Sequence, residues 1–157
     1  PVAAERGAVL LVNDRVDVAH TAGLGVHLGQ DDLPVVEARR LLGPSAVIGR
    51  STHTLAQLDA ALSEPVTYVA YGPVFATVTK VRPDPVVGLG GLAVAAGRAA
   101  AVGMPLVAMG GITLETAPAV RAAGATAVAV ISDLLGGAEG PEVRARRFLS
   151  ALAAEPV

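Results

Sequence analysis

Short apolar stretches alternate along the chain with longer segments rich in alanine and leucine. The short stretches contain β-branched residues and predict strands at residues 8–12, 26–29, 46–51, 68–74, 106–109 and 127–131. The longer segments predict helices at residues 16–22, 34–42, 54–62, 92–101, 114–123 and 142–153. Asp32 is the expected N-cap of the second helix, and Gly43 follows its last turn.

Strands and helices thus alternate as βα units, a pattern typical of one parallel sheet with right-handed crossovers. The apolar run at residues 8–12 favours a strand that is covered on both faces. An open doubly wound sheet concentrates its ligand at one switch point, whereas a (β/α)8 barrel builds its site after many strands. Candidate polar residues and glycines follow all the predicted strands: Asn13, Asp14, Gln30, Asp32, Ser51, His53, Thr77, Thr79, Lys80, Gly110, Gly111 and Ser132. We therefore predict an α/β fold, a (β/α)8 TIM barrel that is incomplete because it has about six of the eight βα units.

No linker or low-complexity segment divides the sequence, so residues 1–157 are predicted to form a single domain. The chain begins at Pro1 rather than at methionine, and we interpret the domain as a barrel truncated at its N-terminus. A barrel that lacks two strands has open edges and exposes part of its core, which favours association. A homo-oligomer is therefore expected.

Composition argues against nucleic-acid binding and against a membrane partner. The formal net charge is −2 and aromatic residues make up 3% of the chain, so the sequence offers no basic stripe or stacking platform for nucleic acid. No uninterrupted apolar run is long enough to cross a bilayer, which predicts a protein without a membrane partner. The sequence contains no cysteine and no signal-peptide pattern, and we expect a cytoplasmic location.

Lys80 is the only lysine, because all the other basic residues are arginine. The loop that it ends also carries the hydroxyls of Thr77 and Thr79. An ammonium pairs with phosphate as a compact point charge, so this loop is suited to anionic oxygens. A solvated turn, in which the threonines cap nearby backbone groups, explains the same residues equally well.

The turns after the last two predicted strands contain a second set of candidates. Gly110 and Gly111 allow backbone N–H groups to approach an anion, and Ser132 follows Ile131 in the corresponding place one unit later. The last two loops of a barrel commonly build a phosphate site. Either loop alone is better explained as a tight turn, but two consecutive loops favour phosphate binding.

Two carboxylates follow neighbouring predicted strands directly. Asp14 and Asp32 would lie at the same edge of the sheet, and Mg²⁺ is typically held by one or two carboxylates together with phosphate oxygens. Helix capping explains the two aspartates equally well. His53 also follows a strand and is a candidate acid or base, whereas His27 lies inside an apolar strand and is expected to be a hydrogen-bonded core residue.

Five motifs in this order resemble the thiamine-phosphate synthase family, over nearly the whole chain. They are Val12 to Arg15, Gly25 to Pro34, Ile48 to His53, Gly72 to Lys80, and Gly110 to Thr113. The resemblance implies a (β/α)8 barrel and a transferase, which joins hydroxymethylpyrimidine pyrophosphate to thiazole phosphate and releases pyrophosphate. It also relates the chain to thiazole tautomerase, which has the same fold.

The resemblance also implies roles for residues at matching positions. Asp14 and Asp32 would bind Mg²⁺, and the pyrimidine pyrophosphate would contact Asn13, Ser51 and Lys80. The thiazole phosphate would be held by Thr77, Val78, Thr79, Gly111, Ile131 and Ser132. Lys80 and Ser51 are the implied catalytic residues. Magnesium and Lys80 would stabilise the departing pyrophosphate while the thiazole nitrogen attacks the pyrimidine methylene.

Departures from the family pattern leave two alternatives open. The family has two further βα units upstream, which carry a motif that grips pyrophosphate. Arg50 stands where a small or apolar residue is usual, and Ala76 where proline is common. One alternative is a tautomerase-like enzyme, which would not need Thr77, Thr79 and Lys80 as a set. The other is a non-catalytic phosphate-binding domain.

Overall fold

Six parallel strands form one curved sheet in the computed structural model, which describes residues 2–77, 84–136 and 139–153. The strands are β1 (Leu11–Asn13), β2 (Gly25–Leu28), β3 (Ile48–Thr52), β4 (Tyr68–Tyr71), β5 (Leu106–Met109) and β6 (Ala127–Ala129). They pair in the order of the sequence, from β1 at one edge to β6 at the other. This arrangement confirms the predicted parallel sheet.

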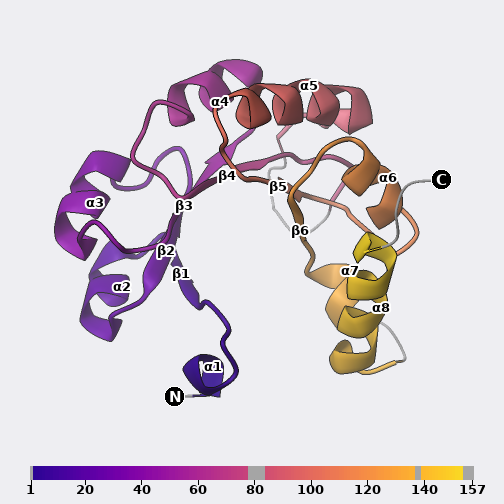
Figure 1. Ribbon diagram of the computed structural model, residues 1–157, viewed down its shortest axis with the longest axis horizontal. Coiled ribbons are helices and arrows are strands. Elements are labelled where there is room, and N and C mark those ends of the chain that lie inside the picture. The colour runs from indigo at the N-terminus through magenta and orange to yellow at the C-terminus, as the bar shows by residue number, and fades with distance from the viewer. Residues whose placement is uncertain (1, 78–83, 137–138, 154–157) are drawn as a thin grey trace.

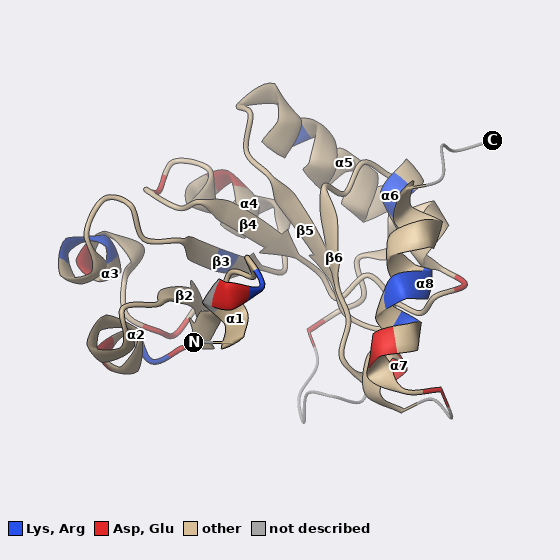
Figure 2. Ribbon diagram, turned by 60° about the horizontal axis from the view of Figure 1, so that its bottom comes forward, with Lys and Arg blue, Asp and Glu red and all other residues tan. Residues whose placement is uncertain are grey.

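The helices are α1 (Val2–Glu5), α2 (Val16–Ala22), α3 (Val35–Leu42), α4 (Leu55–Ala61), α5 (Gly88–Ala101), α6 (Ala117–Ala122), α7 (Ser132–Leu135) and α8 (Pro141–Ala153). Helices α2 to α6 cover the outer side of the curved sheet, α8 packs on α6 and α7, and α1 lies apart from the sheet beyond the beginning of β1 (Figure 1). Charged residues lie mostly on these helices and on the connecting segments (Figure 2). Within the described residues β1 and β6 do not pair, so the sheet is an open arc, as expected for an incomplete barrel.

Two apolar clusters fix the sheet against its helices. The larger cluster packs β4 and β5 against α4, α5, α6 and α8, through residues that include Leu58, Val69, Leu92, Leu106, Val120 and Phe148. The smaller cluster packs β2 and β3 against α2 and α3, through Val16, Ala19, Val26, Leu28, Val35, Ala38 and Ile48. Full burial of one leucine or valine side chain contributes about 1.5–3 kcal/mol. These contacts therefore hold the ends of the strands in defined positions.

The first strand is shorter than the sequence predicted. β1 begins at Leu11, which pairs with Gly25 at the beginning of β2. Val9 and Leu10 were expected in a strand covered on both faces, but these two residues are 72% and 53% exposed. The prediction was wrong because an apolar run does not reveal whether a partner covers it.

Other boundaries move for local reasons. The strand predicted at residues 68–74 ends at Tyr71, shortly before Pro73, which has no N–H for the ladder. The last strand ends at Ala129, and the short helices α1 and α7 were not predicted. α5 begins four residues earlier than predicted, at Gly88, and α6 begins three residues later, at Ala117. None of the described helices combines the length and the apolar character needed to cross a membrane.

Asp32 does not cap the helix that follows it, in contrast to the prediction. α3 begins after Pro34 and has no side-chain cap. The Asp32 carboxylate instead accepts a hydrogen bond of 2.6 Å from the Gly29 N–H. The carboxylate is therefore turned back toward the end of β2, where the candidate site lies.

Candidate functional site

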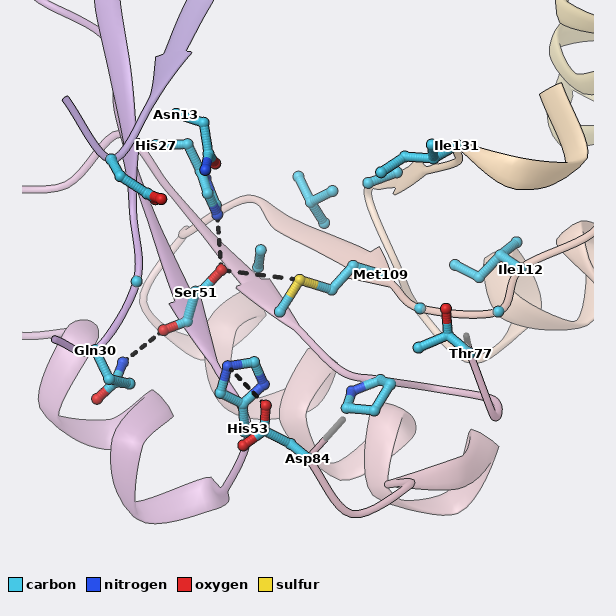
Figure 3. Close-up of a pocket in the computed structure, with 18 of the residues that line it drawn as sticks. Asn13, His27, Gln30, Ser51, His53, Thr77, Asp84, Met109, Ile112 and Ile131 are labelled. Carbon is cyan, nitrogen blue, oxygen red and sulfur yellow. Dashed lines mark hydrogen bonds and ion pairs between the residues drawn. The ribbon is translucent and has the colours of Figure 1, made fainter. Parts of the chain in front are cut away.

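The carboxyl ends of the strands border one cavity of about 870 Å³ (Figure 3). Every predicted site residue that the structure describes lines this cavity, namely Asn13, Asp14, Asp32, Ser51, Thr77, Gly111, Ile131 and Ser132. The remaining predicted site residues, Val78, Thr79 and Lys80, lie outside the described residues. The fold thus brings together residues from all six βα units, although their individual roles stay predictions.

Asp14 and Asp32 lie close to each other at one end of the cavity. Asp14 adopts a φ of 63°, in the left-handed region that aspartate tolerates better than most residues, and its N–H donates to the His27 carbonyl at 2.9 Å. The pKa of Asp14 is raised above its ordinary value, first by burial and then by the hydrogen bond and the negative charge of Asp32. Neither aspartate caps a helix, because α2 and α3 have no side-chain caps.

This pair is suited to a divalent cation. Two adjacent carboxylates disfavour each other's ionised form, and a cation between them removes that repulsion. No cluster of three or more His, Cys, Asp or Glu side chains suited to a metal occurs among the described residues. Asp14 and Asp32 would therefore supply only part of the ligand set. Water and ligand oxygens would complete it, as is usual for Mg²⁺.

Ser51 takes part in a chain of hydrogen bonds in the cavity, and its Oγ donates to Sδ of Met109 at 3.9 Å (Figure 3). Its Oγ lies 2.7 Å from Nε2 of His27, and Nδ1 of His27 lies 2.8 Å from the Tyr68 hydroxyl. The two rings are stacked, with centroids 5.6 Å apart. Burial lowers the pKa of His27 and raises the pKa of Tyr68, so both side chains are held neutral near pH 7.

Gly49 makes room for this arrangement. A Cβ atom at Gly49 would lie 2.2 Å from Cζ of Tyr68, so only glycine admits the phenol ring at this position. Gly49 pairs with His27 on β2 and with Tyr68 on β4. His27 is hydrogen-bonded, as predicted, but it lines the cavity and is only partly buried, so the prediction of a core residue was wrong. Its contact with Ser51 was missed, because that contact depends on the register of β2 against β3.

Gln30 and His53 fasten the loops that surround Ser51. Nε2 of Gln30 donates to the Ser51 carbonyl at 2.6 Å. Nδ1 of His53 lies 2.6 Å from the Gly72 carbonyl and must carry a proton there, since a carbonyl oxygen only accepts. Nε2 of His53 lies 3.5 Å from an Asp84 carboxylate oxygen. His53 thus joins the end of β3 to segments on both sides of residues 78–83, and its predicted role as an acid or base stays a prediction.

The loop after β5 is locked to the segment after β4. Gly110 and Gly111 have φ angles of 93° and 64°, which side chains rarely adopt. A Cβ at Gly111 would lie 2.4 Å from the Ala76 carbonyl oxygen, and the Gly110 carbonyl accepts from the Phe75 N–H at 3.0 Å. Glycine therefore lets this loop approach the segment that leads to Thr77. Both segments border the cavity opposite Asp14 and Asp32.

Asp133 joins the two loops that contain the candidate phosphate residues. One of its oxygens accepts from the Leu114 N–H at 3.0 Å, and both carboxylate oxygens accept from Arg144 of α8 at 2.8 and 2.9 Å. The Arg144 guanidinium holds the pKa of Asp133 below its usual range. The sequence did not indicate this contact, because Asp133 and Arg144 lie on α7 and α8, and Leu114 lies in the segment before α6.

Comparison with known proteins relates this chain to one family. The family model for thiamine monophosphate synthase matches residues 1–134. A thiamine-phosphate synthase of Anaeromyxobacter dehalogenans is 51% identical over 94% of this chain, and one of Koribacter versatilis is 50% identical over 91% of it. The chain spans 65% of the length of both relatives.

A solved structure agrees with these matches. Thiamine phosphate pyrophosphorylase from Pyrococcus furiosus is 32% identical, and the two folds superpose with a TM-score of 0.83. The superposition covers 96% of this chain and 70% of that protein. It confirms the predicted class of fold, and the sequence matches confirm the resemblance on which the site prediction rests. The chain belongs to the thiamine monophosphate synthase family.

Proposed function

We propose that this chain forms the substrate site of a thiamine-phosphate synthase. It would join 4-amino-5-hydroxymethyl-2-methylpyrimidine pyrophosphate to thiazole phosphate, giving thiamine phosphate and pyrophosphate. The observation that carries this proposal is the family match together with the common cavity for eight candidate residues. The chain spans 65% of the length of its synthase relatives, so the activity of those whole proteins is proposed for it.

Mg²⁺ is the cofactor that fits the site best. Burial raises the pKa of Asp14 most, and the hydrogen bond and the negative charge of Asp32 raise it further; a bound cation would relieve the repulsion between the two carboxylates. The carboxylates of Asp14 and Asp32 would hold the ion, whose charge would offset that of the pyrophosphate. Lys80 would add a second positive charge on the departing group.

The chain of hydrogen bonds to Ser51 would orient the pyrimidine. If the Tyr68 hydroxyl donates to Nδ1 of His27, the neutral imidazole carries its proton on Nε2 and donates it to Ser51 Oγ. The Ser51 hydroxyl, which donates to Sδ of Met109 in this structure, would then be able to donate to a ring nitrogen of the pyrimidine instead. Asn13 lines the same part of the cavity and would contact the same substrate.

The opposite side of the cavity would hold the thiazole phosphate. Thr77 and Ser132 offer hydroxyls, and Gly111 and Ile131 offer nearby backbone. Val78 and Thr79 are proposed for the same group by resemblance. In the reaction the bond from the pyrimidine methylene carbon to the pyrophosphate oxygen breaks, and its electron pair leaves with pyrophosphate. A bond from the thiazole nitrogen to that carbon forms, so the catalysis required is positional and electrostatic.

A coupling assay tests this function. The chain is incubated with both substrates and Mg²⁺, beside a fusion that adds the upstream residues of the Anaeromyxobacter synthase. We expect thiamine phosphate from the fusion, and a loss of about tenfold or more in rate for Ser51→Ala. Ser63→Ala is the matched control, because Ser63 is exposed and does not line the cavity. A folded fusion that binds both substrates but forms no product would favour the non-catalytic alternative, and isomerisation of the thiazole alone would favour the tautomerase.

A further inference from the structure

Arg50 is the only Asp, Glu, Lys or Arg residue in the six described strands. Neighbouring residues of a strand point to opposite faces, so Arg50 points away from the cavity that Ser51 lines. It shares its face of β3 with Ile48 and Thr52, which are fully buried. The Arg50 side chain is 12% exposed. A guanidinium at such a position requires partners, because burying an unpaired charge is costly.

Two partners meet that requirement. Nη1 of Arg50 donates to the Gly29 carbonyl oxygen at 2.5 Å, and Nε lies 3.6 Å from Oε2 of Glu64. Oε2 of Glu64 is itself buried and makes no hydrogen bond among the described residues. Arg50 therefore balances the charge of Glu64 through Nε, and Nη1 binds the Gly29 carbonyl just after the end of β2.

Gly29 connects Arg50 to the carboxylate pair. The Gly29 carbonyl accepts from Arg50, while the Gly29 N–H donates to Oδ2 of Asp32 at 2.6 Å. Asp32 in turn lies against Asp14. Gln30, the next residue, is held separately by its bond to the Ser51 carbonyl. The loop that carries Asp32 is thus fixed from outside the barrel by Arg50 and from inside by Gln30.

We propose that Arg50 is a positioning residue, which sets the place of the Asp32 carboxylate for a divalent cation. The inference rests on the proposed function of the Asp14–Asp32 pair. Arg50 does not line the cavity, so it acts through Gly29 rather than by touching substrate. Partners that orient metal ligands in this way typically change metal affinity by about 10- to 100-fold when they are removed.

The decisive comparison separates the two contacts of Arg50. Glu64→Gln keeps the bond to Gly29 and removes only the charge that Arg50 balances. The double variant Arg50→Met with Glu64→Gln removes the bond to Gly29 without leaving a buried charge unpaired. We expect Glu64→Gln to retain the Mn²⁺ affinity of the parent within about twofold, and the double variant to lose about tenfold or more.

Two readouts need neither substrate nor turnover. Mn²⁺ binding is measured by titration calorimetry, and hydrogen exchange of the Gly29 amide is measured in the metal-free chain. The Gly29 amide should exchange faster in the double variant than in Glu64→Gln, because its acceptor Asp32 is no longer fixed. A third readout is coupling by the fusion, where the double variant should need more Mg²⁺ but approach the parent rate at saturation.

The proposal is overturned if the folded double variant binds Mn²⁺ as Glu64→Gln does, or if the parent chain binds no Mn²⁺ at millimolar concentrations. If the double variant does not fold, Arg50→Lys tests the proposal instead. Lysine keeps the positive charge beside Glu64 but cannot contact both Glu64 and the Gly29 carbonyl. Arg50→Lys should then bind Mn²⁺ more weakly, and parent-like binding would overturn the proposal. The double variant could bind Mn²⁺ more weakly while the parent fusion forms no thiamine phosphate. That pair of results would support the role of Arg50 and overturn only the proposed synthase function.

Discussion

The hydroxyl of Tyr68 lies 2.8 Å from Nδ1 of His27 and thereby connects β4 to β2 across the glycine of β3. A neutral imidazole has one donor nitrogen and one acceptor nitrogen, so the partner of Nδ1 decides what Nε2 offers to Ser51. If the Tyr68 hydroxyl donates to Nδ1, Tyr68 sets the direction of the hydrogen bond at Ser51 through the His27 ring.

Replacing Tyr68 by phenylalanine should reverse this hydrogen bond. Without the phenol donor, the His27 proton can move to Nδ1, and Nε2 then accepts the Ser51 proton that the pyrimidine would have received. We expect kcat/KM for the pyrimidine pyrophosphate to fall about tenfold, equivalent to about 1.4 kcal/mol, with little change in the KM for thiazole phosphate. Steady-state kinetics of the fusion protein measure both quantities.

Tyr71→Phe is the matched control for this variant. Tyr71 is 3% exposed, lies on the same strand and does not line the cavity. Removal of the Tyr71 hydroxyl should leave kcat/KM for the pyrimidine pyrophosphate and the KM for thiazole phosphate nearly unchanged. Equal effects of the two substitutions would show that loss of a buried hydroxyl, rather than the direction of the bond at Ser51, explains the result.

A methyl group at Gly49 should disturb the same cluster by crowding. The new Cβ would lie 2.2 Å from Cζ of Tyr68, and such overpacking costs about 1–3 kcal/mol. Gly97→Ala is the contrasting variant, because its Cβ would meet nothing within 4 Å and alanine favours the helix α5 by about 0.5–1 kcal/mol. Urea denaturation should show Gly49→Ala destabilised and Gly97→Ala stabilised. A stable Gly49→Ala protein with unchanged activity would contradict the described packing.

Acid should weaken the junction between Asp133 and Arg144. The pKa of Asp133 is lowered in the folded chain, so its carboxylate contributes stability above the ordinary aspartate pKa. That contribution is lost as the pH falls below about 4 toward the lowered folded value. The melting temperature of Asp133→Asn should therefore lie furthest below that of the parent at neutral pH and approach it in acid.

Glu142→Gln provides the comparison for this pH series. Glu142 pairs with Arg146 on the surface of α8, with 79% of its side chain exposed. Surface pairs of this kind contribute little, so its melting temperature should stay close to that of the parent at every pH. A difference between Asp133→Asn and the parent that does not narrow in acid would contradict the assigned role of the carboxylate.

The sequence predicted the parts of the site that depend on the order of elements. A polar residue at the end of an apolar strand, such as Ser51, or directly after one, such as Asp14, lies at the carboxyl edge whatever the details of packing. The sequence could not predict contacts that depend on how separate strands pair. Gly49 leaves space for the Tyr68 ring only because the register of β3 and β4 places these two residues opposite each other. Asp32 was misread as a cap, since the residue type that caps helices also accepts from other backbone groups.

The carboxylate pair should oppose folding in the absence of a cation. The raised pKa of Asp14 means that its ionised form is disfavoured in the folded chain near neutral pH. Asp14→Asn should therefore raise the melting temperature of the metal-free chain while it weakens Mn²⁺ binding. Asp31→Asn serves as the control, because Asp31 lines the cavity but is not one of the proposed ligands. A lower melting temperature for Asp14→Asn would contradict the conclusion that burial and the neighbouring Asp32 disfavour the ionised form of Asp14.

Product formation in a single turnover tests the central claim most directly. The fusion protein, in excess over the pyrimidine pyrophosphate, is mixed with thiazole phosphate and Mg²⁺, and thiamine phosphate and pyrophosphate are both quantified. We predict equal amounts of the two products, formed only when Mg²⁺ is present, and a much slower reaction for Ser51→Ala. Release of pyrophosphate without thiamine phosphate, or binding of both substrates without any product, would contradict the claim that one cavity joins them.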